Sequence, residues 1–200
     1  MDQISRRTFV KRSMAVGAAF TAASYSRVLG ANNDIRAAVV GFNGRGESHI
    51  EAFSEANGCR VVALCDTDEK VLKNGLRELP NDGEGVATYV DFRKMIEKGD
   101  IDVVGIATPE HQHVPVGAWA MRAGMDIYIE KPMTHTMAEG MYMVKMANKY
   151  KRIVQHGTQK RSSTSAQEGV AFIQSGQIGK CRVAKAINCQ QRDKIKPRPD

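Results

Sequence analysis

The chain has 200 residues and a formal charge of +7, a length that accommodates one complete domain and the beginning of another. Most of the charge lies at the two ends: residues 1–31 carry +4 and residues 191–200 carry +2, which leaves +1 on the residues between them. The net positive charge is therefore concentrated at the two ends of the chain. This distribution argues against a nucleic-acid-binding surface on the folded part.

Residues 1–31 have the pattern of a twin-arginine signal peptide. Arg6 and Arg7 are followed by Phe9 and Lys11, and then by a mildly apolar stretch over 14–23 that is too short for a stable membrane span. We expect export through the twin-arginine route, to the periplasm or otherwise out of the cytoplasm. The alternative is a disordered basic tail.

Strands and helices alternate over residues 34–157, which predicts an α/β fold with a doubly wound parallel Rossmann-type sheet. Segments 61–65 and 102–107 are nearly all apolar, as strands buried on both faces must be. Asp68 and Asp91 are N-cap candidates, and Gly99 and Gly124 end helices. The predicted strands are 36–41, 60–65, 86–89, 102–107, 126–129 and 153–156, and the predicted helices are 45–57, 68–79, 91–98, 112–123 and 136–150.

The first predicted strand runs into a glycine-rich turn, GFNGRG, at residues 41–46. Gly41 lets the chain turn sharply, and Gly46 lets the next helix pack close to the sheet, so that the helix N-terminus attracts a pyrophosphate. Asn43 replaces the middle glycine of the G-x-G-x-x-G pattern. Because Asn tolerates positive φ and Gly44 follows it, we expect the turn to form with a less close approach to the phosphates. Arg45 contacts phosphate or is an exposed salt-bridge partner, and the sequence leaves both open.

Asp66 ends the second predicted strand, 20 residues after Gly46. A carboxylate at this position can accept both ribose hydroxyls of NAD and repels the 2′-phosphate of NADP. The alternative is that Asp66 only caps the next helix. With the glycine turn at the matching spacing, the sequence predicts NAD as the cofactor.

Polar side chains follow the later strands, at the edge where a doubly wound sheet binds its ligand. Lys131, in the Glu-Lys-Pro run after 126–129, is the candidate catalytic residue, because an ammonium beside a nicotinamide ring can take or orient a hydroxyl proton. The alternative is a structural ion pair with Glu130 or Asp126. Further candidates at this edge are Thr108, Pro109, His111, His113, Glu130, His135, Gly157, Thr158, Gln159 and Arg161.

These motifs together resemble the Gfo/Idh/MocA oxidoreductases, which include glucose–fructose oxidoreductase and inositol dehydrogenase. The resemblance covers about residues 34–190. The matching segments are 39–41 with Gly46, 63–66, 106–109 with His113, Gly124, 130–132, 157–161 and 176–180.

The resemblance implies roles for individual residues. Lys131 is expected to touch both substrate and nicotinamide, and Thr108, Pro109, His113 and Glu130 are expected to line the cofactor. His113 is alternatively a plain residue at the start of a helix. Gly41, Asn43, Gly44, Arg45, Gly46 and Asp66 complete the expected cofactor site, and His135, Gln159 and Arg161 are candidates for substrate contact.

From residue 158 the pattern changes and predicts the start of a second α+β domain over 158–200, with a helix at 165–175 and an alternating strand at 181–190. We expect the chain to be part of a longer protein. The resemblance implies that the second domain binds a sugar or cyclitol, forms a homo-oligomer contact, and supplies a further catalytic Asp or His beyond residue 200. The 200 residues alone are therefore expected to be inactive.

The leading functional hypothesis is an NAD-dependent oxidoreductase that transfers hydride between nicotinamide and a hydroxyl-bearing carbon of a sugar or sugar derivative. One alternative is an NAD-dependent glycoside hydrolase, which oxidises its sugar transiently and breaks the glycosidic bond by elimination. Another is a non-catalytic dinucleotide-binding protein. The four cysteines have no metal-ligand spacing, so no metal site is predicted.

Overall fold

The computed structural model describes residues 34–187, and the chain divides into two units after Gly157. The expected signal peptide at 1–31 and the last residues of the predicted strand at 181–190 lie outside the described residues.

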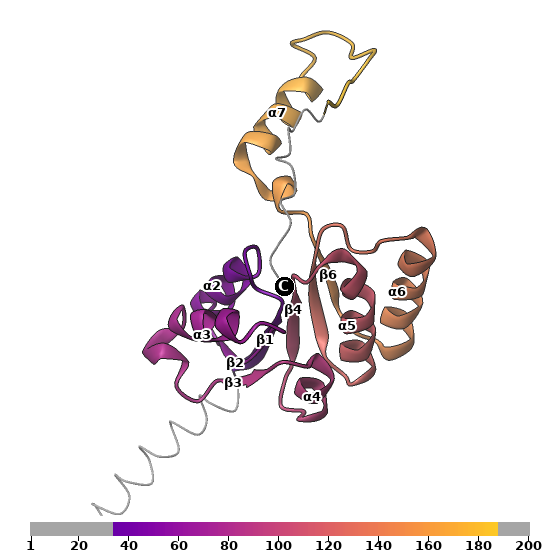
Figure 1. Ribbon diagram of the computed structural model, residues 1–200. Helices are drawn as coiled ribbons and strands as arrows, with labels where there is room; N and C mark the ends of the chain where they lie inside the picture. The colour runs from indigo at the N-terminus through magenta and orange to yellow at the C-terminus, as the bar shows by residue number, and fades with distance from the viewer. Residues whose placement is uncertain (1–33, 188–200) are drawn as a thin grey trace, which may run out of the picture. The chain divides into compact units, whose positions relative to one another are not determined.

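The first unit is built on one sheet of six parallel strands in the order β3-β2-β1-β4-β5-β6 (Figure 1). This order confirms the doubly wound Rossmann-type sheet. Every strand predicted within residues 34–157 is present, with its ends displaced by at most one residue. The strands are β1 Ile35–Val40, β2 Cys59–Cys65, β3 Ala87–Tyr89, β4 Val103–Ile106, β5 Asp126–Glu130 and β6 Val154–Gly157.

Helices cover both faces of this sheet (Figure 1). One core holds Phe42 with Ile50 of α2 and Leu72 of α3, and the opposite core holds side chains of α4, α5 and α6. Both cores are apolar because a parallel sheet between two helical layers is buried on each face. The helices are α2 Glu47–Glu55, α3 Glu69–Arg77, η1 Pro80–Gly83, α4 Phe92–Glu97, α5 Glu110–Arg122 and α6 Met137–Tyr150.

Side-chain caps fix where several of these helices begin. The carboxylates of Asp68 and Asp91 accept hydrogen bonds from the second backbone amide of α3 and α4, at 2.8 and 2.9 Å, as the sequence predicted. Thr136 and Glu139 form a reciprocal capping box at the start of α6. These three capped helices begin within one residue of the starts predicted from the sequence.

The register places the residues after β1, β4 and β5 along one edge of the sheet. Val40 pairs with Ile106, and Ile106 pairs with Ile129. The sheet order reverses between β1 and β4, and ligands of such sheets bind beside the carboxyl ends of the strands at this reversal. The glycine turn after β1 and the Glu-Lys-Pro run at the end of β5 consequently share one edge.

The second unit contains η2 Gln159–Ser162 and α7 Thr164–Gln174, which confirms the predicted helix. The predicted strand at 181–190 is wrong for its described part, because residues 181–187 have no regular secondary structure. A strand requires a neighbour to take its backbone hydrogen bonds, and residues 158–187 contain no other strand. No helix within residues 34–187 is long and apolar enough to cross a membrane.

Candidate functional site

The glycine turn is held between the ends of β1 and β4. Gly41 has φ +75°, and a Cβ atom at this residue would lie 2.8 Å from backbone atoms of Thr108. A Cβ atom on Gly46 would lie 2.2 Å from the carbonyl oxygen of Gly41. Both positions therefore require glycine, one for its backbone angle and its close neighbour and the other for the packing of α2 on the turn.

Gly44, and not Asn43, takes the left-handed backbone that the sequence allowed at either residue. Gly44 has φ +114°, whereas Asn43 is absent from the residues with positive φ. Both residues are exposed. The turn thus forms without the middle glycine of the pattern, and its outer rim is open to a ligand.

Asp66 is joined directly to this turn. Its Oδ2 accepts a hydrogen bond from the backbone amide of Phe42 at 3.2 Å, and its Oδ1 accepts one from the amide of Asp68 at 3.0 Å. A carboxylate offers about four lone-pair sites, so acceptor capacity remains for ligand hydroxyls. Asp66 therefore fixes the turn and caps the chain after β2, and it still presents oxygens to a ligand.

A cleft of about 710 Å³ opens along the carboxyl ends of β1, β2, β3 and β4. The cleft is lined by four residues that the sequence predicted for the cofactor site at this edge: Gly41, Asp66, Thr108 and Pro109. The hydroxyl oxygen of Thr108 is buried and has no hydrogen-bond partner among the described residues. A polar ligand in the cleft could satisfy it.

Sequence reasoning missed the part of the cleft that follows β3. Asp91, Phe92 and Arg93 line it there, and Trp119 of α5 faces them. The rings of Phe92 and Trp119 meet edge to face, with centroids 6.4 Å apart. The signal was available, because residues after β3 share the edge with residues after the other strands. Trp119 is 46% exposed.

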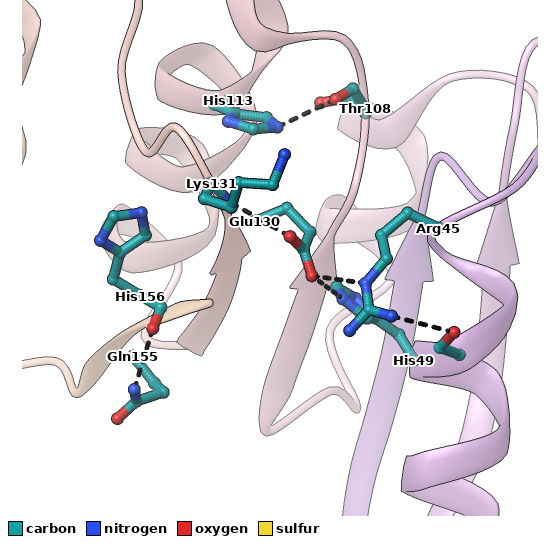
Figure 2. A network of polar contacts seen from close by, with 9 residues as sticks. Arg45, His49, Thr108, His113, Glu130, Lys131, Gln155 and His156 are labelled. Carbon is teal, nitrogen blue, oxygen red and sulfur yellow. Dashed lines mark hydrogen bonds and ion pairs between the residues drawn. The ribbon is translucent and has the colours of Figure 1, made fainter. Parts of the chain in front are cut away.

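Glu130 is the centre of a polar network at the end of β5 (Figure 2). Its Oε1 accepts hydrogen bonds from Nε of Arg45 at 2.9 Å and from Nε2 of His49 at 3.1 Å, and its Oε2 accepts one from the amide of Lys131 at 3.2 Å. Burial raises the pKa of the carboxyl, but the hydrogen bonds from Arg45 and His49 outweigh burial and hold the pKa at about 2. The buried carboxylate is therefore ionised and ties α2 to β5.

His49 is a neutral partner in this network. Its side chain is 5% exposed, and burial lowers its pKa against the opposing effect of Glu130. Nδ1 is buried and has no hydrogen-bond partner among the described residues. The ring therefore carries its proton on Nε2, which donates to Glu130, and a second proton would bury an unsatisfied N–H group.

Arg45 forms a salt bridge with Glu130, so only part of its guanidinium is available to a phosphate. Besides the bond to Glu130, one terminal nitrogen donates to the Ser48 hydroxyl at 3.2 Å. Its side chain remains 51% exposed, so the guanidinium still faces solvent beside the turn. The two roles that the sequence left open are compatible.

Lys131 is exposed, and its ammonium takes part in no ion pair among residues 34–187. The structural pair with Glu130 or Asp126 is therefore not formed: Arg45 and His49 occupy Glu130, and Asp126 faces Arg152 at 3.9 Å. Figure 2 shows the Lys131 side chain extending away from the Glu130 carboxylate. The Lys131–Pro132 peptide bond is cis.

His113 lies behind the cleft rather than on its surface. Its ring is 1% exposed; Nδ1 lies 2.8 Å from the carbonyl oxygen of Pro132, and Nε2 lies 2.9 Å from that of Thr108. The residue thus bridges the segments after β4 and β5 and is more than a plain residue at a helix start.

The predicted substrate candidates are divided between the two units of the chain. His135 is exposed, and its backbone amide donates to the Glu139 carboxylate at 2.9 Å, next to the start of α6. Gln159 and Arg161 belong to η2 of the second unit. No group of three His, Cys, Asp or Glu side chains within residues 34–187 could hold a metal ion.

Comparisons with known proteins agree with this geometry. The model of the oxidoreductase family described as having an NAD-binding Rossmann fold matches residues 35–158. Among curated relatives, a glycosyl hydrolase family 109 protein of Shewanella sp. strain ANA-3 is 30% identical over 163 residues. The match covers 70% of this chain and 36% of the relative, so the chain spans about a third of the length of that protein.

Two solved structures share the fold. A myo-inositol 2-dehydrogenase from Lactobacillus plantarum superposes with a TM-score of 0.66 at 30% identity, over 74% of this chain and 43% of that one. A scyllo-inositol dehydrogenase from Lactobacillus casei, solved with NAD(H) and scyllo-inositol, gives a TM-score of 0.64 at 23% identity, over 73% of this chain and 42% of that one. The second likeness is one of fold alone.

Proposed function

Since the chain belongs to the Gfo/Idh/MocA family of NAD-binding oxidoreductases, we propose that the full-length protein moves hydride between nicotinamide and a hydroxyl-bearing carbon of a sugar or sugar derivative. The observation that carries this proposal is the placement of Lys131. It is an exposed lysine without an ion-pair partner among the described residues, at the ligand edge of the sheet. Such a lysine is available for proton transfer.

The described residues fit NAD. Gly41, Gly44 and Gly46 form a turn that leaves room for a pyrophosphate at the start of α2, and Asp66 keeps acceptor sites for the ribose hydroxyls. Phe92 and Trp119 give the cleft an aromatic wall for the adenine. When bound, NAD supplies the hydride acceptor, which no side chain can provide.

Lys131 acts in this proposal as the acid–base group. Oxidation of an alcohol removes a hydride from carbon and a proton from oxygen, and Lys131 is the group that takes the proton. In the reverse direction its ammonium returns the proton to the carbonyl oxygen. Glu130 and Arg45 do not touch the reacting atoms; they hold the backbone of Lys131 through the contact between its amide and Oε2 of Glu130.

A specific observation favours a second function, glycoside hydrolysis through transient oxidation. Curated relatives up to 30% identical are named as glycosyl hydrolase family 109 proteins. In this chemistry hydride leaves the sugar and later returns to it, so the cofactor is regenerated in each cycle. Lys131 would transfer a proton both when the sugar is oxidised and when it is reduced again. The first domain therefore suits a dehydrogenase as well as a glycoside hydrolase.

One experiment separates the two functions. The full-length protein is incubated with NAD and either free sugars and cyclitols or aryl glycosides, while absorbance at 340 nm and aglycone release are followed together. NADH formed in proportion to sugar consumed supports the oxidoreductase. Aglycone release without net NADH supports the hydrolase, and neither signal across both panels, with NAD bound, leaves a dinucleotide-binding protein.

We place this activity outside the cytoplasm, on the twin-arginine pattern of residues 1–31. That route carries folded proteins, which suits a protein that must acquire NAD before export. The remainder of the second domain, beyond residue 200, is proposed to bind the sugar and to form a homo-oligomer contact.

A further inference from the structure

Arg93 is the one arginine or lysine among the described residues that line the cofactor cleft. Its guanidinium contacts Asp91 through two donors: Nε lies 3.0 Å from Oδ1, and Nη2 lies 2.6 Å from Oδ2. Two parallel N–H donors make the strongest pair that a guanidinium forms with a carboxylate, and the same fork of donors suits a phosphate. Arg93 therefore has the chemistry of a phosphate anchor, and Asp91 occupies its donors.

This ion pair lies beside the residue proposed to meet the adenosine ribose. The amide of Asp66 donates to the carbonyl oxygen of Tyr89 at 3.1 Å, and Asp91 follows Tyr89 by two residues. Asp66, Asp91 and Arg93 all line the cleft. The Arg93 side chain is 58% exposed, so the pair with Asp91, and not packing, holds its guanidinium in place.

Two carboxylates face one guanidinium at this end of the cleft. Hydrogen bonds from the Arg93 side chain and amide hold the pKa of Asp91 at about 2, so this carboxylate is ionised at neutral pH. Asp66 accepts from the backbone amides of Phe42 and Asp68, so Asp91 is the carboxylate that neutralises Arg93. The net charge that an incoming phosphate meets here is therefore negative.

We propose that Asp91 is a specificity-determining residue, which excludes NADP by keeping Arg93 from binding the 2′-phosphate. The inference rests on the proposed cofactor site, in which Asp66 meets the ribose. NAD has a 2′-hydroxyl and has no need of Arg93, whereas the 2′-phosphate of NADP must compete with Asp91 for the guanidinium. Exclusion of NADP is thus divided between repulsion by Asp66 and occupation of Arg93 by Asp91.

Asp91→Asn separates the ion pair from the helix cap. Asn is as good an N-cap as Asp, so the bond from the side-chain oxygen to the amide of Arg93 is kept, and α4 with it. The full-length protein is titrated with NAD and with NADP by calorimetry at low ionic strength. Asp91→Asn should bind NADP roughly tenfold more tightly than the wild type, with less than about a threefold change for NAD.

Removing Arg93 tests whether this residue is the anchor. When Asp91→Asn is added to Arg93→Ala, the affinity for NADP should change by less than about threefold, because no guanidinium remains to be released. Glu97→Gln removes a carboxylate from the other end of α4 and leaves the pair intact, so this control should leave both affinities unchanged. An equal gain with and without Arg93 overturns the proposal, as does a gain shared equally by NAD and NADP.

These outcomes separate the inference from the proposed function, because binding needs no turnover. A wild type that binds NAD but neither forms NADH nor cleaves a glycoside fails the proposed reaction and leaves the inference standing. Unchanged NADP affinity in Asp91→Asn, in a protein that turns over its sugar with NAD, fails the inference alone. A wild type that binds NADP as tightly as NAD, or binds neither, overturns it as well. Asp91→Ser also caps α4 and replaces Asp91→Asn if that variant does not fold.

Discussion

Arg45 donates from Nε to Oε1 of Glu130 across 2.9 Å, and this ion pair joins the glycine turn to the residue that precedes Lys131. The two residues lie 85 positions apart in the chain. Because the pair and His49 occupy Oε1 of Glu130, the ammonium of Lys131 is not tied to its neighbour. The cofactor turn and the proposed catalytic residue are thus parts of one network (Figure 2).

Glu130 should contribute stability that depends on pH in a defined window. Its pKa is held at about 2 in the folded protein, below about 4.3 for an unperturbed glutamate. The contribution is therefore complete above pH 4.3 and is lost as pH falls towards 2. His49, whose pKa is also lowered, acts in the same direction below its unperturbed value.

Glu130→Gln should consequently lower the free energy of unfolding by about 2 kcal/mol at pH 7 and should flatten its fall below pH 4.3. Urea unfolding at pH 7, 5, 4 and 3 measures both effects. Glu97→Gln, on the exposed face of α4, is the control. Parallel curves for the wild type and Glu130→Gln would show that the network does not depress this pKa.

Gly46→Ala should damage the turn by a clash rather than by backbone strain. Gly46 has a helical φ of −68°, but its added Cβ atom would meet the Gly41 carbonyl oxygen at 2.2 Å. We expect a loss of about 3 kcal/mol in stability together with weaker NAD binding, measured by thermal unfolding with and without NAD. Gly140→Ala in α6 is the control: its Cβ atom would meet only the Thr134 hydroxyl, at 3.5 Å, and the substitution should be tolerated. Equal losses of stability in the two variants would show that close packing at Gly46 does not stabilise the turn.

Asp66 should make the protein prefer NAD to NADP. Its carboxylate lines the cleft directly after β2, and in the proposed cofactor site it would face the 2′-phosphate of NADP; placing like charges together costs several kcal/mol. Titrating each cofactor by calorimetry should give NAD the lower dissociation constant, and Asp66→Ala should narrow the difference. Equal or tighter binding of NADP by the wild type would contradict the ribose role of Asp66.

The sequence predicted the sheet well because buried parallel strands and capped helices have local signals. The apolar runs at 61–65 and 102–107 and the caps at Asp68 and Asp91 depend on residues within a few positions of one another. The alternation of strands with helices predicted a parallel, doubly wound sheet.

The site was predicted in outline and missed in its contacts. The sequence located Glu130, Arg45 and His113 at the ligand edge, but the bond between Arg45 and Glu130 and the two carbonyl partners of His113 depend on tertiary packing. No local pattern encodes such pairs. The strand predicted at 181–190 is not formed over 181–187. Alternation of apolar and polar residues favours a strand, but the strand also needs a neighbouring strand with which to pair, and the local sequence does not encode one.

The export hypothesis has a simple test in residues 1–31. Replacing Arg6 and Arg7 with lysine should leave the protein in the cytoplasm with its leader uncut, since the twin-arginine route reads the paired arginines. Cell fractionation and immunoblotting of the full-length protein follow its location and length. Undiminished export of the double variant would mean that another route reads the segment.

The central claim is that Lys131 performs proton transfer and does not support the fold. Lys131→Ala in the full-length protein should lower kcat by roughly 10²–10⁴-fold, the usual scale for a positioned acid–base group, while the melting temperature and the dissociation constant of NAD change little. Lys145→Ala, an exposed lysine of α6, should leave all three unchanged. The decisive measurement is kcat of Lys131→Ala on the sugar that the wild type oxidises or cleaves: a fall within that range with an unaltered fold supports the account, and full turnover or an unfolded variant contradicts it.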